Sequence, residues 1–223
     1  MNRGAVLIGF VLSVATLIAQ EKTPPKVDPF ARWEPAITAF EKRDAVTMPP
    51  KNGILFVGSS SIVGWKLDRF FPDLLVINRG FGGSQIADSV HFAERIITNY
   101  EPRIIVFYAG DNDIAAKRTP EQCRDAFREL VKIVHAKLPK TQIIFLSIKA
   151  SPSRWKMVEA QKQANTMIAD DCARDERLKY LDLVTPLLGK DGMPRMELFK
   201  PDGLHLNDDG YQIWTEKLVP LLN

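Results

Sequence analysis

The chain has few of the residues that build metal centres. Its 223 residues include three histidines and two cysteines. A two-metal hydrolytic site needs more histidine and carboxylate ligands at several strand ends, and His91 and His135 both lie within helical patterns. We therefore expect no metal and no cofactor. Metal-dependent phosphoester hydrolysis stays an alternative, because Gly110-Asp111-Asn112-Asp113 is rich in carboxylates.

A basic block, internal repeats and low-complexity tracts are also absent. The 30 Lys and Arg residues are scattered among 27 Asp and Glu residues, and the formal net charge is +3. This pattern does not favour nucleic-acid binding. The chain is 45% hydrophobic and 26% charged, which is typical of one globular domain of ordinary size.

The apolar run at the N-terminus is too short to span a bilayer. It extends from Ala5 to Ala19 after Arg3, whereas a membrane helix needs about 20 residues. A positive residue before a short apolar run is typical of a secretory signal peptide. We predict a signal peptide over 1–19, a flexible leader over 20–30 and a single domain over 31–223. The protein is then secreted or periplasmic, without stable membrane insertion after cleavage; an uncleaved anchor is the alternative.

Five short apolar runs alternate with helical patterns along the domain. Their β-branched and aromatic residues indicate strands that are buried on both faces. These runs are Ile54–Val57, Leu75–Ile77, Ile104–Tyr108, Ile143–Ile148 and Tyr180–Val184. Helices are predicted over about 86–98, 119–138 and 154–174, and after Asn207. The alternation predicts a parallel sheet with helices on both faces and a ligand site beyond the carboxyl ends of the strands.

Small and polar residues follow the first three strands. They are Gly58-Ser59-Ser60-Ser61, Asn78-Arg79-Gly80-Phe81-Gly82-Gly83 and Gly110-Asp111-Asn112-Asp113, and Asp202-Gly203-Leu204-His205 precedes the last helix. Each segment alone is typical of a turn. In this order they supply a hydroxyl, exposed backbone N–H groups, an amide donor and a His–Asp pair, which are the groups that acyl transfer requires.

The four segments resemble the sequence blocks of the SGNH hydrolases, also called GDSL-type esterases, over about residues 52–220. The likeness is strongest to the platelet-activating-factor acetylhydrolase-like branch, whose second block has the form Asn-x-Gly-x-Gly-Gly. The resemblance implies a flavodoxin-like three-layer sandwich with a five-stranded parallel sheet of order 2-1-3-4-5. It also implies that Ser60 is the nucleophile, that His205 is the base and that Asp202 orients His205. The backbone N–H groups of Ser60 and Gly83 and the side chain of Asn112 would form the oxyanion hole.

The first block departs from the family at Ser59, where Asp is usual. Ile62 stands where Gly-x-Ser-x-Gly needs its second glycine, so a sharp nucleophile elbow is not expected. Side chains of an extended strand alternate between faces, which separates Ser60 from Ser59 and Ser61. The family spacing places the nucleophile two residues after Gly58, so Ser60 is the predicted nucleophile among the three serines.

The substrate is less well defined by the sequence. No long apolar insertion separates the blocks, so a short acyl group, most simply acetyl, is expected. Related members remove acetyl groups from carbohydrates, so the predicted partner is a small-molecule or carbohydrate ester. Trp65, Arg154 and Trp155 are candidate substrate contacts, with core packing as the alternative for both tryptophans. An inactive carbohydrate-binding protein on the same fold is the alternative from another class.

The two cysteines are predicted to stay unpaired. Cys123 lies near the start of one crossover helix and Cys172 near the end of the next. Parallel helices would hold them about 20 Å apart along the axis, and a disulfide needs Cα atoms within about 7 Å.

Overall fold

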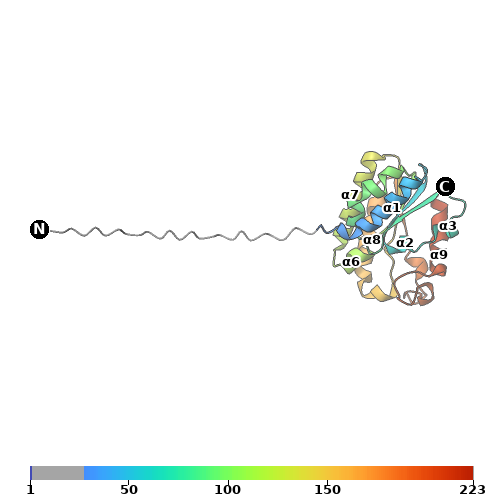
Figure 1. Ribbon diagram of the computed structural model, residues 1–223. Coiled ribbons are helices and arrows are strands. Elements are labelled where there is room, and N and C mark those ends of the chain that lie inside the picture. Colours follow the sequence, from blue (N-terminus) through green and yellow to red (C-terminus); the bar gives the residue numbers. More distant parts are fainter. Residues whose placement is uncertain (2–27, 223) are drawn as a thin grey trace.

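The computed structural model describes Met1 and residues 28–222, which form a sheet covered by helices on both faces (Figure 1). The strands are β1 Ile54–Gly58, β2 Val76–Gly80, β3 Ile104–Tyr108, β4 Gln142–Leu146 and β5 Leu178–Leu181. Every neighbouring pair is parallel, and the order is β2-β1-β3-β4-β5. The predicted fold and strand order are confirmed. The predicted signal peptide lies outside the described residues.

Two apolar cores lie on opposite faces of this sheet. The α-helices of the described residues are α1 Glu34–Val46, α2 Ser60–Val63, α3 Leu67–Phe70, α4 Ile86–His91, α5 Ala93–Ile96, α6 Asp111–Ala115, α7 Pro120–Lys137, α8 Val158–Cys172 and α9 Asp208–Leu218. Leu55 and Val57 of β1 pack into the core beneath α1, α4, α5, α7 and α8, whereas Ile54 and Phe56 pack toward α3 and α9. Figure 1 shows α1, α7 and α8 on one side of the sheet and α9 on the other. Alternate side chains of each strand thus build separate cores.

The first helix, α1, was not predicted, although it lies within the predicted domain. Only Ile37 and Phe40 of α1 are buried, so the helix carries too weak an apolar stripe to be recognised by periodicity. Phe30, assigned to the leader, stacks on the ring of His91 with centroids 3.9 Å apart. The N-terminal segment is therefore part of the packed domain from about Phe30 onward.

Four of the five strands have other bounds than the apolar runs suggested, and β2 and β5 differ most. β2 continues through Arg79, whose buried guanidinium is paired with Asp44 of α1 and donates to the Tyr100 hydroxyl at 2.8 Å. β5 ends earlier than predicted because Asp182 bends the chain: its Oδ1 accepts hydrogen bonds from the N–H groups of Val184 and Thr185. The end of β2 thus depends on a long-range ion pair and the end of β5 on a local side-chain hydrogen bond, and hydrophobic periodicity encodes neither.

Helix boundaries follow their capping residues. Thr119 and Gln122 form a reciprocal capping box at the start of α7, which begins close to the predicted residue 119. The helix expected over 86–98 is interrupted at Phe92, which separates α4 from α5. The helix expected from 154 begins as a 3-10 helix, Pro152–Met157, and continues as α8.

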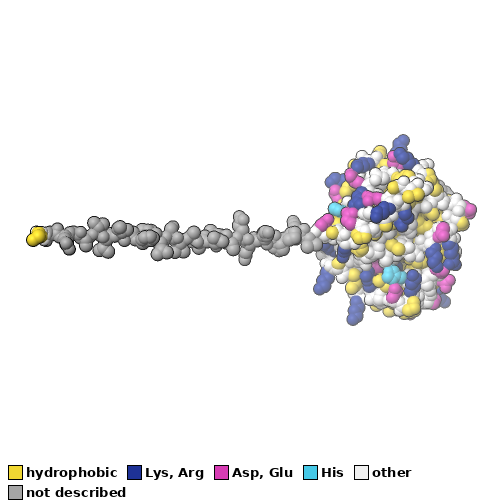
Figure 2. Space-filling view, in the orientation of Figure 1, with side chains coloured by type: hydrophobic (Ala, Val, Ile, Leu, Met, Phe, Trp, Pro, Cys, Tyr) yellow, Lys and Arg dark blue, Asp and Glu magenta, His cyan; other side chains and the backbone are white. Residues whose placement is uncertain are grey.

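Three further expectations concern the surface charge, membrane-spanning helices and the two cysteines. Figure 2 shows basic and acidic side chains intermingled over the visible face. None of the helices within 28–222 combines the length and the apolar character needed to cross a membrane. Cys123 and Cys172 are both buried and free, as predicted, and burial raises the pKa of each thiol to about 12.

Candidate active site

Ser60 stands at the carboxyl end of β1, where the strand turns into α2. Gly58, the last residue of β1, has φ +138°, and a Cβ at this position would lie 1.9 Å from the carbonyl oxygen of Tyr108. Only glycine allows β1 to approach β3 this closely. Ser59 and Ser61 are 2% and 1% exposed, whereas Ser60 is half-buried. Ser60 is therefore the accessible serine of the three.

His205 and Asp202 lie on a turn that precedes α9. Oδ1 of Asp202 accepts hydrogen bonds at 2.9 Å from the backbone N–H groups of Leu204 and His205. Gly203 within the turn has φ +61°. Asn207, not this pair, caps α9 by accepting from the Gly210 N–H. The Asp202 turn thus presents the His205 ring toward β1.

A continuous hydrogen-bonded chain joins Ser60, His205 and Asp202. Nε2 of His205 lies 2.9 Å from the Ser60 hydroxyl, and Nδ1 lies 2.7 Å from Oδ2 of Asp202. The imidazole and two backbone N–H groups hold the pKa of Asp202 well below its usual range. An ionised carboxylate only accepts, so Nδ1 carries the proton and the neutral ring leaves Nε2 as an acceptor for the serine. This geometry suits a general base.

The loop after β2 borders the serine turn. Nδ2 of Asn78 donates to the carbonyl of Ile62 at 2.8 Å, and its Oδ1 accepts from the Gly80 N–H. Asn78 therefore ties β2 to α2. Gly83 follows with φ +75°, and a Cβ there would lie 3.2 Å from Cη2 of Trp33. Trp33, which sequence reasoning did not single out, thus covers one side of this loop from the segment before α1.

Asn112 reaches the same edge of the sheet from α6. Its Nδ2 donates to the carbonyl of Ser84 at 3.0 Å, and its Oδ1 accepts from the Arg154 guanidinium at 3.1 Å. Since Ser84 adjoins Gly83, the loops after β2 and β3 are joined directly. The structure thus brings the sequence-predicted residues of all four segments to one edge of the sheet.

The three candidate substrate contacts have different surroundings. Trp65 is 1% exposed and packs among Phe56, Tyr211 and Trp214, with its indole N–H donating to Thr215. It cannot contact a substrate, and of its two predicted roles core packing is the correct one. Trp155 is half-buried in the 3-10 helix beside Arg154.

A buried charged cluster lies next to Asn112, and sequence reasoning missed it. Nζ of Lys149, which is 1% exposed, lies 3.0 Å from Asp111, 3.1 Å from the Tyr108 hydroxyl and 3.4 Å from the Ser61 hydroxyl. Burial alone would raise the pKa of Asp111, but Lys149 and Arg154 together lower it. Burial would likewise lower the pKa of Lys149, yet Asp111 raises it. Asp111 and Lys149 therefore both stay charged.

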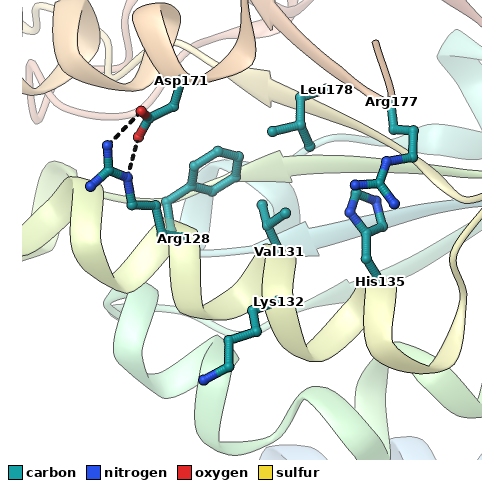
Figure 3. Close-up of a pocket in the computed structure, with 8 residues that line it drawn as sticks. Arg128, Val131, Lys132, His135, Asp171, Arg177 and Leu178 are labelled. Atoms are coloured by element: carbon teal, nitrogen blue, oxygen red, sulfur yellow. Dashed lines mark hydrogen bonds and ion pairs between the residues drawn. The ribbon is translucent and has the colours of Figure 1, made fainter. Parts of the chain in front are cut away.

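A separate hollow lies at the opposite end of the sheet (Figure 3). It encloses about 200 Å³ between α7 and α8, beside Leu178, the first residue of β5. Arg128 and Arg177 at this hollow are already paired with Asp171 and Asp175. Within 28–222, no group of three or more His, Cys, Asp and Glu side chains is placed to hold a metal ion.

Comparison with known proteins assigns the family. Residues 57–213 match the GDSL-like lipase/acylhydrolase family. This match includes the turn of Ser60, the loop of Gly83 after β2, Asn112 after β3 and the turn of His205. The chain therefore belongs to the GDSL-like lipase/acylhydrolase family and is a carboxylic ester hydrolase. No curated protein sequence gives a significant match.

Solved structures share the same fold. A Streptococcus pneumoniae protein provisionally named a platelet activating factor has a TM-score of 0.78 and 21% identity, over 86% of this chain and 94% of the other. A GDSL-like lipase from Bacteroides thetaiotaomicron has a TM-score of 0.70 and 20% identity, over 83% and 96%. A catalytic mutant of an acetylxylan esterase from Geobacillus stearothermophilus has a TM-score of 0.62 and 13% identity, over 78% and 95%.

Proposed function

We propose that the protein is a serine esterase that cleaves short-chain acyl esters, acetyl esters foremost, through an acyl-enzyme on Ser60. The observation that carries this proposal is the hydrogen-bonded chain from Ser60 through His205 to Asp202, at 2.9 Å and 2.7 Å. Asp202 fixes the ring and its tautomer, so that His205 is ready to accept the serine proton.

In the acylation step, Oγ of Ser60 bonds to the ester carbonyl carbon while its proton moves to Nε2 of His205. The carbonyl π electrons move to oxygen and form an oxyanion. The backbone N–H groups of Ser60 and Gly83 and one N–H of the Asn112 amide stabilise this charge. When the intermediate collapses, the C–O bond to the alcohol breaks, and the leaving alkoxide takes the proton from Nε2.

Deacylation repeats these steps with water as the nucleophile. His205 takes a proton from a water molecule as its oxygen bonds to the acyl carbon. The second oxyanion occupies the same hole, and its collapse releases the carboxylic acid. Ser60 leaves with the proton from Nε2, which restores the starting state.

The open and polar surroundings of the site support a small and water-soluble substrate. The side chains of His205 and Asp202 are 30% and 48% exposed, and the charged Arg154 lies beside Asn112. A long acyl tail would need extended apolar walls at this point. The acetylxylan esterase among the structures of like fold makes acetylated carbohydrate a substrate class to test first.

A fluorophosphonate probe tests the proposed nucleophile, because it forms a covalent bond with an activated serine hydroxyl. We expect a single adduct on Ser60 by tandem mass spectrometry, and faster hydrolysis of p-nitrophenyl acetate than of octanoate. A screen of acetylated xylo-oligosaccharides then defines the alcohol. An adduct on Ser59 or Ser61 would overturn the assignment of the nucleophile. Loss of esterase activity on chelation, restored by a divalent ion, would instead favour the metal-dependent alternative.

We also propose that the protein is exported, since residues 1–19 have the layout of a signal peptide. Expression of the full chain in a bacterial host tests this proposal. The protein recovered from the periplasm or medium should begin after Ala15 or Ala19, as read by N-terminal sequencing. A full-length protein that stays in the cytoplasm would contradict it.

A further inference from the structure

The side-chain amide of Asn112 is held between two groups of opposite hydrogen-bonding character. The Ser84 carbonyl oxygen can only accept, and it takes a hydrogen bond from Nδ2 at 3.0 Å. The Arg154 guanidinium can only donate, and it donates to Oδ1 at 3.1 Å. A 180° rotation of the amide would set acceptor against acceptor and donor against donor. This pair of contacts therefore permits one orientation of the amide.

The permitted orientation leaves one N–H of Asn112 unused. An amide nitrogen carries two hydrogens, and Ser84 takes one of them. The rotated amide would offer the oxyanion a carbonyl oxygen in place of an N–H, which would repel the developing charge. Arg154 thus fixes the orientation of the Asn112 amide and, through it, the ability of Asn112 to stabilise the oxyanion.

Arg154 is itself held firmly by the buried cluster. Its Nη1 is buried 2.7 Å from Oδ1 of Asp111, an ion pair rather than a well-aligned hydrogen bond. The side chain is 19% exposed. The Asp111 carboxylate also accepts hydrogen bonds from Nζ of Lys149 at 3.0 Å and from Nε2 of Gln161 at 3.2 Å. A guanidinium whose Nη1 is paired with a buried carboxylate keeps its Nη2 directed toward Asn112.

We propose that Arg154 is a positioning residue that fixes the Asn112 amide with an N–H toward the oxyanion. The inference rests on the proposed function, because it takes Asn112 as an oxyanion donor. It replaces the direct substrate contact expected from the sequence for Arg154. Since the interaction matters most in the transition state, the loss should fall on kcat and leave KM nearly unchanged.

A double-mutant cycle between Arg154→Met and Asn112→Ala tests this inference on p-nitrophenyl acetate. Removal of one oxyanion donor lowers kcat about 10²–10³-fold, so we expect that loss for Asn112→Ala. Arg154→Met should lower kcat about 10- to 100-fold, within that limit, with KM changed less than about threefold. In the Asn112→Ala background the same change should have an effect below about threefold, because the group on which Arg154 acts is gone.

Arg154→Lys provides a variant in which Asp111 keeps a second cation beside Lys149. A lysine ammonium cannot reproduce the planar fork that reaches both Asp111 and Asn112, so we expect a folded protein with kcat lowered about tenfold. Arg128→Gln is the matched control, since Arg128 also pairs with a helix carboxylate, Asp171, at the other end of the sheet. Its kcat should stay within about twofold of the parent value.

The outcomes separate this inference from the proposed function. Equal losses of kcat from Arg154→Met with and without the Asn112 side chain would overturn the role of Arg154 alone. A rise of KM with unchanged kcat would do the same and would return Arg154 to substrate binding. A normal kcat for Asn112→Ala would overturn the oxyanion role of Asn112 and, with it, the inference.

Discussion

Two polar clusters at the same edge of the sheet differ in their access to water. Ser60, His205 and Asp202 form a chain that reaches the surface, with Asp202 48% exposed. Lys149 and Asp111 form an ion pair with side chains 1% and 6% exposed. The exposed chain can exchange protons with solvent, whereas burial and opposite charges fix the protonation of the second cluster. Chemistry and structural support are therefore assigned to separate groups, which Arg154 connects through Asn112. Substitution of Ser60, His205 or Asp202 should act on activity, and substitution of Lys149 or Asp111 should act mainly on stability.

The largest expected effect is loss of turnover in the exposed cluster. Ser60→Ala should lower kcat by about four to six orders of magnitude, the range for removal of a triad nucleophile. The free energy of unfolding should change by less than about 1 kcal/mol, because the hydroxyl is half-buried and its partner ring can bind water. Steady-state kinetics and urea unfolding measure the two effects.

Ser59→Ala and Ser61→Ala are the matched controls for that substitution. Both side chains are buried beside Ser60, and their loss should lower kcat only about tenfold, through looser positioning. A Ser60→Ala protein with near-normal turnover would break the comparison and shift the nucleophile to another serine.

The second prediction concerns stability in the buried cluster. Lys149→Met leaves Asp111 with Arg154 alone and should lower the free energy of unfolding by about 3–5 kcal/mol, the cost of breaking a buried pair. In the Lys149→Met/Asp111→Asn double variant the losses should be less than additive by about 1–3 kcal/mol, because both substitutions break the same ion pair. Denaturant unfolding of both single variants and the double variant measures this coupling. Additive losses would show that the two side chains are not energetically coupled.

Sequence reasoning located the exposed cluster because the segments of Ser60 and of Asp202 and His205 resemble blocks of a known family. The parallel topology predicted that the loops after β1, β2 and β3 meet, and the resemblance implied the roles of Ser60, Gly83 and Asn112 before their distances were known. The buried cluster depends instead on contacts between residues far apart in the chain. Lys149 and Asp111 are 38 positions apart, and no local pattern indicates that a lysine after β4 points inward.

The same difference explains what sequence reasoning left open for Trp65 and missed at the N-terminus. Trp65 follows the serine turn closely in sequence, but its ring turns into the core formed with α9. Periodicity also failed for α1, where few residues are buried. The sequence patterns therefore did not predict which side chains are buried by contacts between distant parts of the chain.

The third prediction is a pH profile that belongs to the exposed cluster alone. Only the neutral imidazole of His205 can accept the serine proton, so kcat/KM should fall on acidification, by about tenfold per pH unit once the ring is protonated. Asp202 stays ionised in this range because its pKa is held well below the usual value. Lys149, with a raised pKa, and Asp111, with a lowered one, also keep their charges. Asp113 of α6 also titrates in this range, because burial raises its pKa to about 6, so the profile is measured with p-nitrophenyl acetate in the Asp113→Asn variant. There the acid limb should report one proton, and a limb of two protons would show that another group titrates.

The smallest effect is expected from Asp113, which shares α6 with Asp111 but has no cation from residues 28–222 at its carboxylate. It is 3% exposed and accepts hydrogen bonds from the Ile86 N–H at 3.1 and 3.3 Å. Burial outweighs these bonds and raises the pKa of Asp113 from 3.8 to about 6. Between these two values the folded protein holds a proton that the unfolded chain has lost, so stability falls as pH rises through this window.

Asp113→Asn should remove that loss, because an amide oxygen can still accept from Ile86 but carries no charge. Its advantage over the parent protein in free energy of unfolding should grow between pH 4 and pH 7, to on the order of 1–3 kcal/mol. Urea unfolding at several pH values measures this difference. Asp73→Asn, which replaces an exposed carboxylate, is the control and should show no such growth. If the difference in free energy of unfolding between Asp113→Asn and the parent protein stays constant with pH, the Asp113 carboxyl group has the same pKa in the folded and the unfolded state. The contrast between the pKa values of Asp113 and Asp111 would then be wrong.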